Sequence, residues 1–312
     1  MSNAVVFPGQ GSQAVGMGQA LAEAFPEARH LFEEVDDALG QKLSRLMWEG
    51  PAEDLTLTEN AQPALMAVSV AVMRVLEKQG NWRLADKAAF VAGHSLGEYS
   101  ALAAAGTFTI ADTARLLKLR GQAMQKAVPV GIGAMAALLG VELPEAEAIA
   151  AESAQGEICQ VANDNSSGQV VISGHKAAID RAIALAAEKG FKRSVLLPVS
   201  APFHCALMQP AADAMAEALQ KVSLSAPVVP VVTNVTAAPT VDPDLIRAQL
   251  VQQVTGTVRW RECVLTMKGL GVERLIEVGS GKVLAGLTKR IDKDIAALSL
   301  QTPEDIDAFL SA

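Results

Sequence analysis

Residues Phe90 to Gly106 read FVAGHSLGEYSALAAAG and contain the pattern that best predicts the fold of this chain. A short apolar run at 88–92 leads into the GHSLG motif at 93–97, and a run of small residues typical of a helix follows. Strand, Gly-x-Ser-x-Gly and helix in this order are the layout of a nucleophile elbow. The free N–H groups at the start of such a helix are available to an oxyanion. The pattern therefore favours Ser95 as a nucleophile over an ordinary strand-to-helix turn.

The composition is that of a globular chain with a large hydrophobic core. Of the 312 residues, 50% are hydrophobic and 19% are charged, which suits one large domain or two smaller ones. The net charge is −8 and no long run of Lys and Arg occurs, so nucleic acid is not an expected partner. The apolar run at 4–7 is too short for a signal peptide, and no run approaches the length of a membrane span. We therefore expect a cytoplasmic protein without membrane contact.

The cysteine pattern supports the same compartment and gives no sign of a metal site. The three cysteines, Cys159, Cys205 and Cys263, are an odd number without Cys-x-x-Cys spacing, as in proteins whose thiols stay reduced. The sequence has no His-x-x-x-His pattern, no cysteine pair and no Asp-rich loop. No metal ligand set is therefore predicted.

Only one of the four histidines has the sequence context of a catalytic base. His204 lies in the Pro-containing loop 199–205, after a predicted strand and downstream of Ser95. Serine before histidine is the chain order of the hydrolases that use this elbow. His94 adjoins Ser95, but at an elbow its side chain is expected to point away from the serine. We therefore predict that His204 is the general base.

Two glycine-rich segments resemble nucleotide-binding loops but fail the full patterns. Gly9-x-Gly11-x-x-Ala14 fits the loose dinucleotide fingerprint, yet helical patterns follow where a second strand ending in an acidic residue is required. The segment 279–282 resembles half a phosphate loop, with Ile276 and Val283 in place of the required Gly and Ser or Thr. We interpret the first loop as a strand-end loop beside the elbow, where it can supply a second oxyanion donor.

The middle of the chain has its own pattern of elements. Strand, helix, strand, strand, helix and strand are predicted in turn at 134–139, 143–153, 159–162, 169–173, 176–188 and 193–198, with a turn cluster at 163–168. This order is the split βαβ, ferredoxin-like unit. We therefore predict a parallel-sheet, α/β-hydrolase-like large domain formed by 1–127 and 198–312, with an inserted ferredoxin-like subdomain at 128–197. A cleft between the two is an expected ligand site.

Five motifs together resemble the malonyl-CoA:acyl-carrier-protein transacylase family over nearly the whole chain. They are FPGQGSQ at 7–13, GHSLGEY at 93–99, LRGQAM at 119–124, PFHC at 202–205 and EVGSGKVL at 277–284. The resemblance implies ping-pong transfer of a malonyl group from malonyl-CoA, through a malonyl-serine ester, to the pantetheine thiol of acyl carrier protein. It places the enzyme in fatty-acid synthesis and implies no cofactor besides this substrate.

The resemblance also implies a role for each site residue. Ser95 would be the nucleophile, and His204 the base and later the acid. The backbone N–H groups of Gln10 and Leu96 would form the oxyanion hole. Arg120 would hold the free malonate carboxylate through a bidentate pair, so that an acetyl group would leave a desolvated guanidinium unpaired.

Two further residues follow from the resemblance with less support from the sequence. Phe203 resembles the aromatic residue that accompanies malonyl rather than branched substrates in related domains. A backbone carbonyl on a Gln is expected to orient His204, and Gln253 matches best, although the adjacent Gln252 leaves this assignment open by one residue. The family also suggests a monomer.

Other functions remain open at this point. A serine esterase or thioesterase on the same elbow would also acylate its serine, and a non-catalytic module would only dock an acidic carrier protein. The same transferase could serve a polyketide pathway or a malonate decarboxylase. Candidate basic residues for carrier docking form two groups, Lys282, Lys289 and Arg290 or Lys192 and Arg193.

Overall fold

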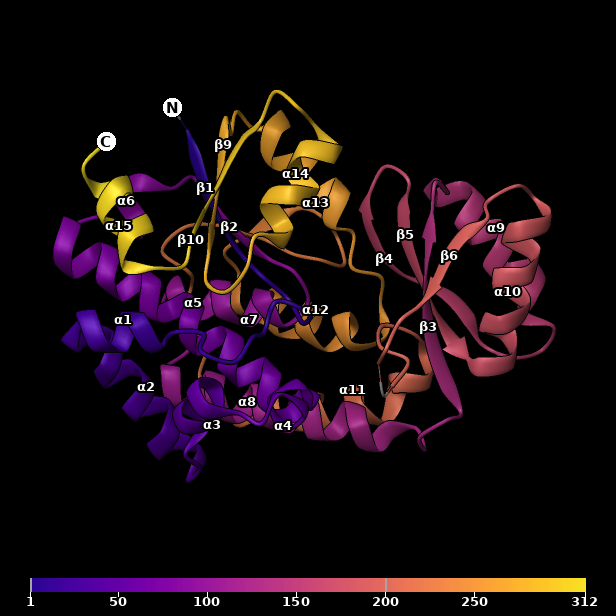
Figure 1. The fold of residues 1–312 in the computed structure, drawn as a ribbon, viewed down its shortest axis with the longest axis horizontal. Helices are drawn as coiled ribbons and strands as arrows, with labels where there is room; N and C mark the ends of the chain where they lie inside the picture. The colour runs from indigo at the N-terminus through magenta and orange to yellow at the C-terminus, as the bar shows by residue number, and fades with distance from the viewer. Residues whose placement is uncertain (1, 200) are drawn as a thin grey trace.

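The computed structural model describes residues 2–199 and 201–312. Ser200, part of the predicted loop 199–205, lies outside the described residues. Two sheets organise the described chain, one of six strands and one of four. Figure 1 shows the smaller sheet beside the larger one, with its two helices on the far side. None of the described helices is long and apolar enough to cross a membrane.

The larger sheet sets the position of the nucleophile elbow. Its strands are β1 (Asn3–Phe7), β2 (Phe90–Gly93), β7 (Val231–Val232), β8 (Pro239–Thr240), β9 (Arg274–Val278) and β10 (Ala296–Leu300). Their order is β10-β9-β1-β2-β7-β8, and all pairs are parallel except β7 with β8. The central strands β1 and β2 are in register to their ends, where Phe7 pairs with Gly93. The loops that follow these two strands therefore begin side by side at one edge of the sheet.

Most of the helices belong to the large part of the chain, and α5 is central among them. They are α1 (Gln19–Ala24), α2 (Pro26–Leu39), α3 (Leu43–Glu49), α4 (Ala52–Thr56), α5 (Thr58–Gly80), α6 (Leu84–Lys87), α7 (Leu96–Ala104), α8 (Ile110–Ala127), α11 (Gln209–Gln220), α12 (Pro243–Thr255), α13 (Trp260–Gly269), α14 (Val283–Ile291) and α15 (Pro303–Leu310), with a short 3-10 turn at Ala206–Met208. Helix α5 is buried nearly all round, as its uniformly apolar sequence predicts. The helices α2, α7 and α8 pack against it.

Helices cover both faces of the larger sheet because its central strand is buried on both sides. Ala4 and Val6 of β1 pack into the cluster that includes Trp260 and Leu284, whereas Val5 and Phe7 join the larger cluster on the other face. Successive side chains of a strand point to opposite faces, so an apolar run can serve two helix layers. Figure 1 shows α13 and α14 on one side and α5 and α7 on the other.

The smaller sheet is antiparallel and has the order β4-β5-β3-β6. Its elements are β3 (Gly133–Leu139), α9 (Leu143–Ala154), β4 (Cys159–Ser166), β5 (Gln169–His175), α10 (Lys176–Glu188) and β6 (Arg193–Leu196). Ala136 and Leu138 of β3 pack against α9 and α10 in a separate hydrophobic cluster. Met135 and Ala137, on the opposite face of the strand, join the large cluster instead. Alternation along β3 thus joins the two sheets into one body.

The mixed α/β class with a parallel sheet is confirmed, but two local expectations are wrong. Residues 163–166 were predicted as a turn and instead continue strand β4, so that the turn shortens to 167–168. The side chains of Asp164 and Asn165 are buried because they bond to Arg261 and His94 in the large part of the chain, which a local sequence pattern does not reveal. The apolar run at 228–233 also predicts a strand, but only Val231–Val232 form one, β7. The sequence patterns predict neither β10 nor α15.

Candidate active site

The elbow at Gly93–Gly97 has the geometry that its glycines predict. Ser95 has φ 54° and ψ −112°, a conformation that non-glycine residues rarely adopt. A Cβ on Gly93 would lie 1.9 Å from the backbone of Gly97, and a Cβ on Gly97 would lie 2.2 Å from the carbonyl oxygen of Phe7. The turn is therefore so tight that neither position accepts a side chain, and Ser95 stands at the end of β2 where α7 begins.

A hydrogen-bonded chain links Ser95 to His204 and Gln253. The hydroxyl Oγ of Ser95 lies 2.8 Å from Nε2 of His204, and Nδ1 of His204 lies 2.8 Å from the backbone carbonyl oxygen of Gln253. Because a carbonyl oxygen can only accept, Nδ1 carries the proton and Nε2 is the free acceptor for the serine proton. The carbonyl that His204 contacts belongs to Gln253 and not to its neighbour Gln252.

His204 is held as a neutral imidazole. Its side chain is 4% exposed, and burial is the main cause that lowers its pKa to about 3, with the positive charge of Arg120 adding to the effect. The bond to the Gln253 carbonyl raises the pKa and only partly offsets this shift. At neutral pH the ring therefore has its Nε2 lone pair available to Ser95.

Arg120 is buried beside the serine and not solvated on the surface of α8. Its Nη2 donates to the Ser95 hydroxyl at 3.1 Å and to Oε1 of Gln253 at 2.8 Å, and its Nη1 donates to Oε1 of Gln62 at 2.8 Å. The guanidinium lies 5.7 Å from the ring centre of Tyr99, and burial lowers its pKa. Within the described part of the chain, no carboxylate forms an ion pair with Arg120. A buried guanidinium without a counter-ion is suited to an anionic ligand.

A cavity of about 340 Å³ opens over these residues. It is lined by Ser95, His204 and Arg120 together with Gln10, Gly11, Gln13, Thr56, Gln62, His94, Leu96, Met124, Met135, Asn163, Leu197, Pro198, Val199 and Phe203. Leu96 is the first residue of α7, so its N–H has no acceptor within the helix. Gln10 lies in the loop after β1, next to the elbow, and its side chain is fixed by the Thr58 hydroxyl at 2.9 Å. All seven predicted site residues thus lie at or behind this one cavity.

The structure adds polar residues that the sequence patterns did not identify. His94 lines the cavity, and its Nε2 lies 2.8 Å from Oδ1 of Asn165 on β4 and not at the hydroxyl of Ser95. Gln62 holds Arg120, and Asn163 adds a polar wall from the smaller sheet. The available signal for Gln62 is a polar side chain at the start of an otherwise apolar helix. The basic candidates for carrier docking do not line the cavity.

One carboxyl side chain, of Glu98, and one carboxamide side chain, of Asn234, lie beneath the elbow. Glu98, on the first turn of α7, is fully buried, and burial raises its pKa to about 7, against the opposing effect of a hydrogen bond from the Asn234 N–H. Asn234, also fully buried, follows β7 and contacts the backbone of Ser95. Neither residue lines the cavity, so both act on the site from behind.

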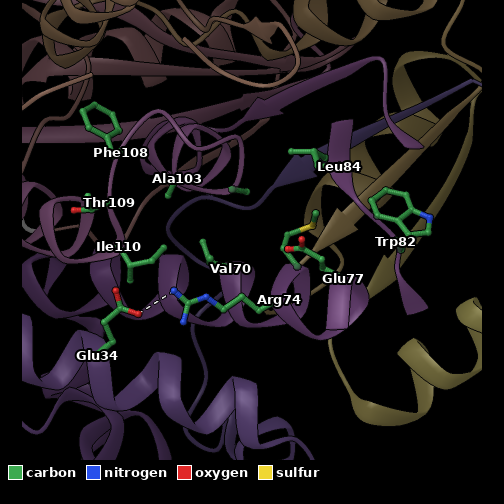
Figure 2. Close-up of a pocket in the computed structure, with 12 residues that line it drawn as sticks. Glu34, Val70, Arg74, Glu77, Trp82, Leu84, Ala103, Phe108, Thr109 and Ile110 are labelled. Carbon is green, nitrogen blue, oxygen red and sulfur yellow. Dashed lines mark hydrogen bonds and ion pairs between the residues drawn. The ribbon is translucent and has the colours of Figure 1, made fainter. Parts of the chain in front are cut away.

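A second cavity, of about 380 Å³, lies between α5 and the region that connects α7 to α8. Figure 2 shows the ion pair of Arg74 with Glu34 at its edge, and Trp82, Leu84 and Phe108 among its apolar lining. None of its lining residues is a serine, cysteine or histidine. Of the two cavities, only the one over Ser95 therefore offers a serine nucleophile and a histidine base. No group of metal-ligating side chains occurs in residues 2–199 and 201–312.

The fold and the geometry around Ser95 indicate the class of enzyme before any comparison with known proteins. A mixed α/β fold with a serine at a strand-to-helix elbow, in hydrogen-bond contact with a neutral histidine, is that of the serine-dependent acyl-transfer enzymes.

Comparison with known proteins gives the family. The acyl transferase domain family matches residues 4–294, and the chain belongs to this family. It is 48% identical over 307 residues to the malonyl CoA-acyl carrier protein transacylase of Escherichia coli K12, covering 98% of each chain. The structure superposes on an acyl-carrier-protein-S-malonyltransferase from Bartonella henselae with a TM-score of 0.97 at 58% identity, covering 100% and 99% of the two chains.

A third relative was solved together with a carrier. It is a malonyl-transacylase in complex with a type II PKS acyl-carrier protein, and it matches at 43% identity with a TM-score of 0.96, covering 100% of this chain and 99% of that one. The chain is therefore an acyltransferase whose relatives are malonyl-transferring enzymes.

Proposed function

We propose that this enzyme transfers a malonyl group from malonyl-CoA to the phosphopantetheine thiol of acyl carrier protein, through a malonyl ester on Ser95, and so supplies fatty-acid synthesis. The observation that carries this proposal is the buried guanidinium of Arg120, which lies 3.1 Å from the Ser95 hydroxyl and forms no ion pair with a carboxylate of the described chain. A malonyl group ends in a carboxylate, and its thioester carbonyl lies two bonds away. A carboxylate on Arg120 would therefore place the thioester close to the nucleophile.

The first half-reaction uses the Ser95–His204 pair. His204 Nε2 takes the hydroxyl proton as Ser95 Oγ attacks the thioester carbon, and the carbonyl oxygen becomes an oxyanion. The N–H groups of Leu96 and Gln10 are assigned to this oxyanion, and each such donor is typically worth about 3 kcal/mol of barrier. When the C–S bond breaks, the imidazolium returns its proton to the CoA thiolate, and Ser95 is left as the malonyl ester.

The second half-reaction runs the same steps with a new nucleophile. The carrier thiol gives its proton to His204 Nε2 and attacks the ester carbon, and Ser95 Oγ leaves with that proton. Gln253 is assigned to hold His204 in its Nδ1–H form through its carbonyl oxygen. Phe203 and the other apolar residues of the cavity wall are assigned to limit access of water and of branched acyl groups.

We also propose the domain division 1–127 with 198–312, and 128–197 as an inserted ferredoxin-like subdomain. The strand order β4-β5-β3-β6, the antiparallel pairing and the separate cluster with α9 and α10 support it. The parallel sheet with its strand-to-helix elbow supports the α/β-hydrolase-like description of the large domain.

For the acceptor, we propose a negatively charged carrier that docks on one of two groups of exposed basic residues. Lys282, Lys289 and Arg290 are exposed on or beside α14, and Lys192 and Arg193 are exposed at β6. Charge reversal at the docking group should weaken use of the carrier and spare acylation by malonyl-CoA, because only the second half-reaction needs the carrier. We further propose a cytoplasmic monomer that needs no cofactor besides its substrate.

Intact mass after brief exposure to malonyl-CoA, without carrier protein, tests the proposed function, with Ser95→Ala as the control. A malonyl-sized adduct on the wild type alone is the expected result. Free malonate without an adduct would instead indicate a serine thioesterase or esterase, and neither adduct nor turnover would indicate a binding module. Adding carriers from fatty-acid, polyketide and malonate decarboxylase systems to the malonyl-enzyme then identifies the acceptor by the rate at which the adduct is lost.

A further inference from the structure

The backbone of Ser95 needs support because its conformation is strained. A non-glycine residue at φ 54° and ψ −112° costs of the order of 1–3 kcal/mol and persists only where the surroundings hold it. The N–H of Gly97 donates to the carbonyl oxygen of His94 at 2.9 Å, but the two glycines have no side chain with which to hold the backbone of Ser95 itself. The side chain that holds the turn must therefore come from elsewhere in the chain.

Asn234 provides both hydrogen bonds that such a support requires. Its Oδ1 accepts from the backbone N–H of Ser95 at 2.8 Å, and its Nδ2 donates to the carbonyl oxygen of Gly93 at 2.7 Å. The carboxamide of Asn234 thus spans the turn from Gly93 to Ser95. A carboxylate has no donor for Gly93, so among side chains of this size only Asn makes both bonds.

Glu98 fixes Asn234 in turn. Its Oε2 accepts from the backbone N–H of Asn234 at 2.7 Å, and the backbone carbonyl oxygen of Asn234 accepts from the N–H of Arg259 at 3.1 Å. Glu98 stands one turn into α7, the helix that Ser95 begins. The elbow, its helix and the segment after β7 therefore form a closed ring of hydrogen bonds.

Gln253 connects this ring to the reacting groups. Its Nε2 donates to the carbonyl oxygen of Ser95 at 3.0 Å and to Oδ1 of Asn234 at 3.3 Å. Its Oε1 accepts from Arg120, and its backbone oxygen accepts from His204. A shift of Asn234 would thus change the position of Ser95 relative to both its base and its guanidinium.

We infer that Asn234 is a positioning residue for acylation: it holds the strained backbone of Ser95 so that Oγ meets His204. Glu98 supports Asn234 through the acceptor oxygen of its side chain. Both act through Ser95 and touch no substrate. This inference rests on Ser95 being the nucleophile of the proposed function. Misplacement of a reacting group by about 1 Å can cost on the order of a hundredfold in rate.

Single-turnover acylation by malonyl-CoA separates positioning from folding, because the burst amplitude counts active molecules and the rate constant reports their geometry. Asn234→Ala and Asn234→Asp should lower the rate constant by about ten- to a hundredfold, with little change in half-saturation. Glu98→Gln keeps the acceptor and should retain the wild-type rate, whereas Glu98→Ala should slow it. Asn60→Ala removes a buried Asn that bonds only to residues remote from the elbow, and should keep the rate constant.

The inference is overturned if the active fraction of Asn234→Ala acylates at the wild-type rate, or if Glu98→Gln is as slow as Glu98→Ala. Reaction of the same variants with a small sulfonyl fluoride provides a readout that does not depend on malonyl specificity. If the wild type reacts with this probe but not with malonyl-CoA, the proposed function fails and the ranking of the variants still tests Asn234. If the wild type reacts with neither, Ser95 is not an activated nucleophile and both proposals fail.

Discussion

At the scale of single residues, Arg120 has opposite effects on the free enzyme and on the complex with malonyl-CoA. In the free enzyme its charge helps to lower the pKa of His204, so the ring does not hold a proton. A bound malonate carboxylate would compensate that charge and make the imidazolium of the first half-reaction less costly. An acetyl group offers no such compensation. Selection for malonyl would therefore come from the base as well as from the ion pair.

Replacing Arg120 with Ala tests this coupling. We expect malonyl acylation of Ser95 to fall by about a hundredfold or more, because hydrogen bonds to a charged partner are worth about 1.5–3 kcal/mol each. Acetyl acylation should fall much less, since acetyl never used the guanidinium. Arg115→Ala, on the exposed side of the same helix, is the matched control and should leave both rates unchanged. Equal losses for malonyl and acetyl would contradict the assignment.

The pH dependence of the same step follows from His204. Because its pKa is lowered to about 3, the rate constant for acylation should stay flat from pH 8 down to about pH 5, with no inflection near 6.5. The unfolded chain binds a proton at His204 below about pH 6.5, and the folded chain does so only near pH 3. Stability should therefore fall with decreasing pH across this window. His204→Gln should remove that part of the fall in denaturant titrations, and an unchanged pH profile would contradict the low pKa.

At the scale of elements, the elbow is expected to be very sensitive to substitution. Gly93→Ala places a methyl group 1.9 Å from backbone atoms that cannot move without opening the turn. We expect a loss of more than about 3 kcal/mol in the free energy of unfolding, or no folded protein. Gly286→Ala is the control within helix α14, where a new Cβ meets nothing within 4 Å, and it should stabilise by up to about 1 kcal/mol. Urea denaturation measures both changes.

The elements that the sequence predicts well are those whose pattern is local. The elbow is one such element, because strand, glycines, serine and helix follow one another within 17 residues. The helix predicted at 176–188 is another, and its predicted bounds match those of α10. His204 was predicted from its loop and chain order, and its contact with Ser95 is the geometry that this prediction requires.

Other features could not be predicted from the sequence because they depend on contacts across the fold. Asn165 looks like a turn residue, yet the strand continues through it because its side chain meets His94 from 71 positions away. The burial of Arg120 has no signature in the helical pattern, and only the resemblance to a family pointed to it. The role of Asn234 depends on its hydrogen bonds to Gly93 and Ser95, some 140 positions earlier, and no local sequence pattern indicates it.

At the scale of the whole molecule, the smaller sheet completes the active site through strand β4. The N–H of Asp164 donates to Val258 and the N–H of Val258 donates to Ala162, so β4 pairs with the segment that follows α12. Asn163, between these two residues of β4, lines the cavity. The pairing joins the smaller sheet to the segment just after Gln253, and a loose sheet would therefore disturb both the cavity wall and the support of His204.

Arg261 forms two ion pairs across this junction, with Asp164 and with Glu142, and replacing it tests how firmly the two sheets are joined. Its Nε lies 3.0 Å from Oδ2 of Asp164, whose side chain is 1% exposed. Arg261→Ala leaves that carboxylate buried without a cation, which typically costs about 3–5 kcal/mol. We expect a lower free energy of unfolding at pH 7 and faster hydrogen exchange in β4. Burial already raises the pKa of Asp164, and Arg261 opposes that shift, so the pKa should rise further in the variant. The loss in free energy of unfolding should therefore shrink as the pH is lowered and the carboxyl group becomes protonated.

The same variant connects stability to function. If the smaller sheet closes the cavity against water, the malonyl-enzyme of Arg261→Ala should hydrolyse faster than that of the wild type. Its acylation rate should change little, because Ser95 and His204 both lie in the large part of the chain. Arg45→Ala removes a solvent-exposed pair with Glu49 and is the matched control, expected to leave the free energy of unfolding almost unchanged. Loss of the intact-mass adduct over time measures hydrolysis directly. A destabilised variant whose ester survives as long as the wild-type ester would show that the part of the chain around the larger sheet excludes water alone. The smaller sheet would then serve another step, and the carrier-dependent half-reaction would be the next to measure.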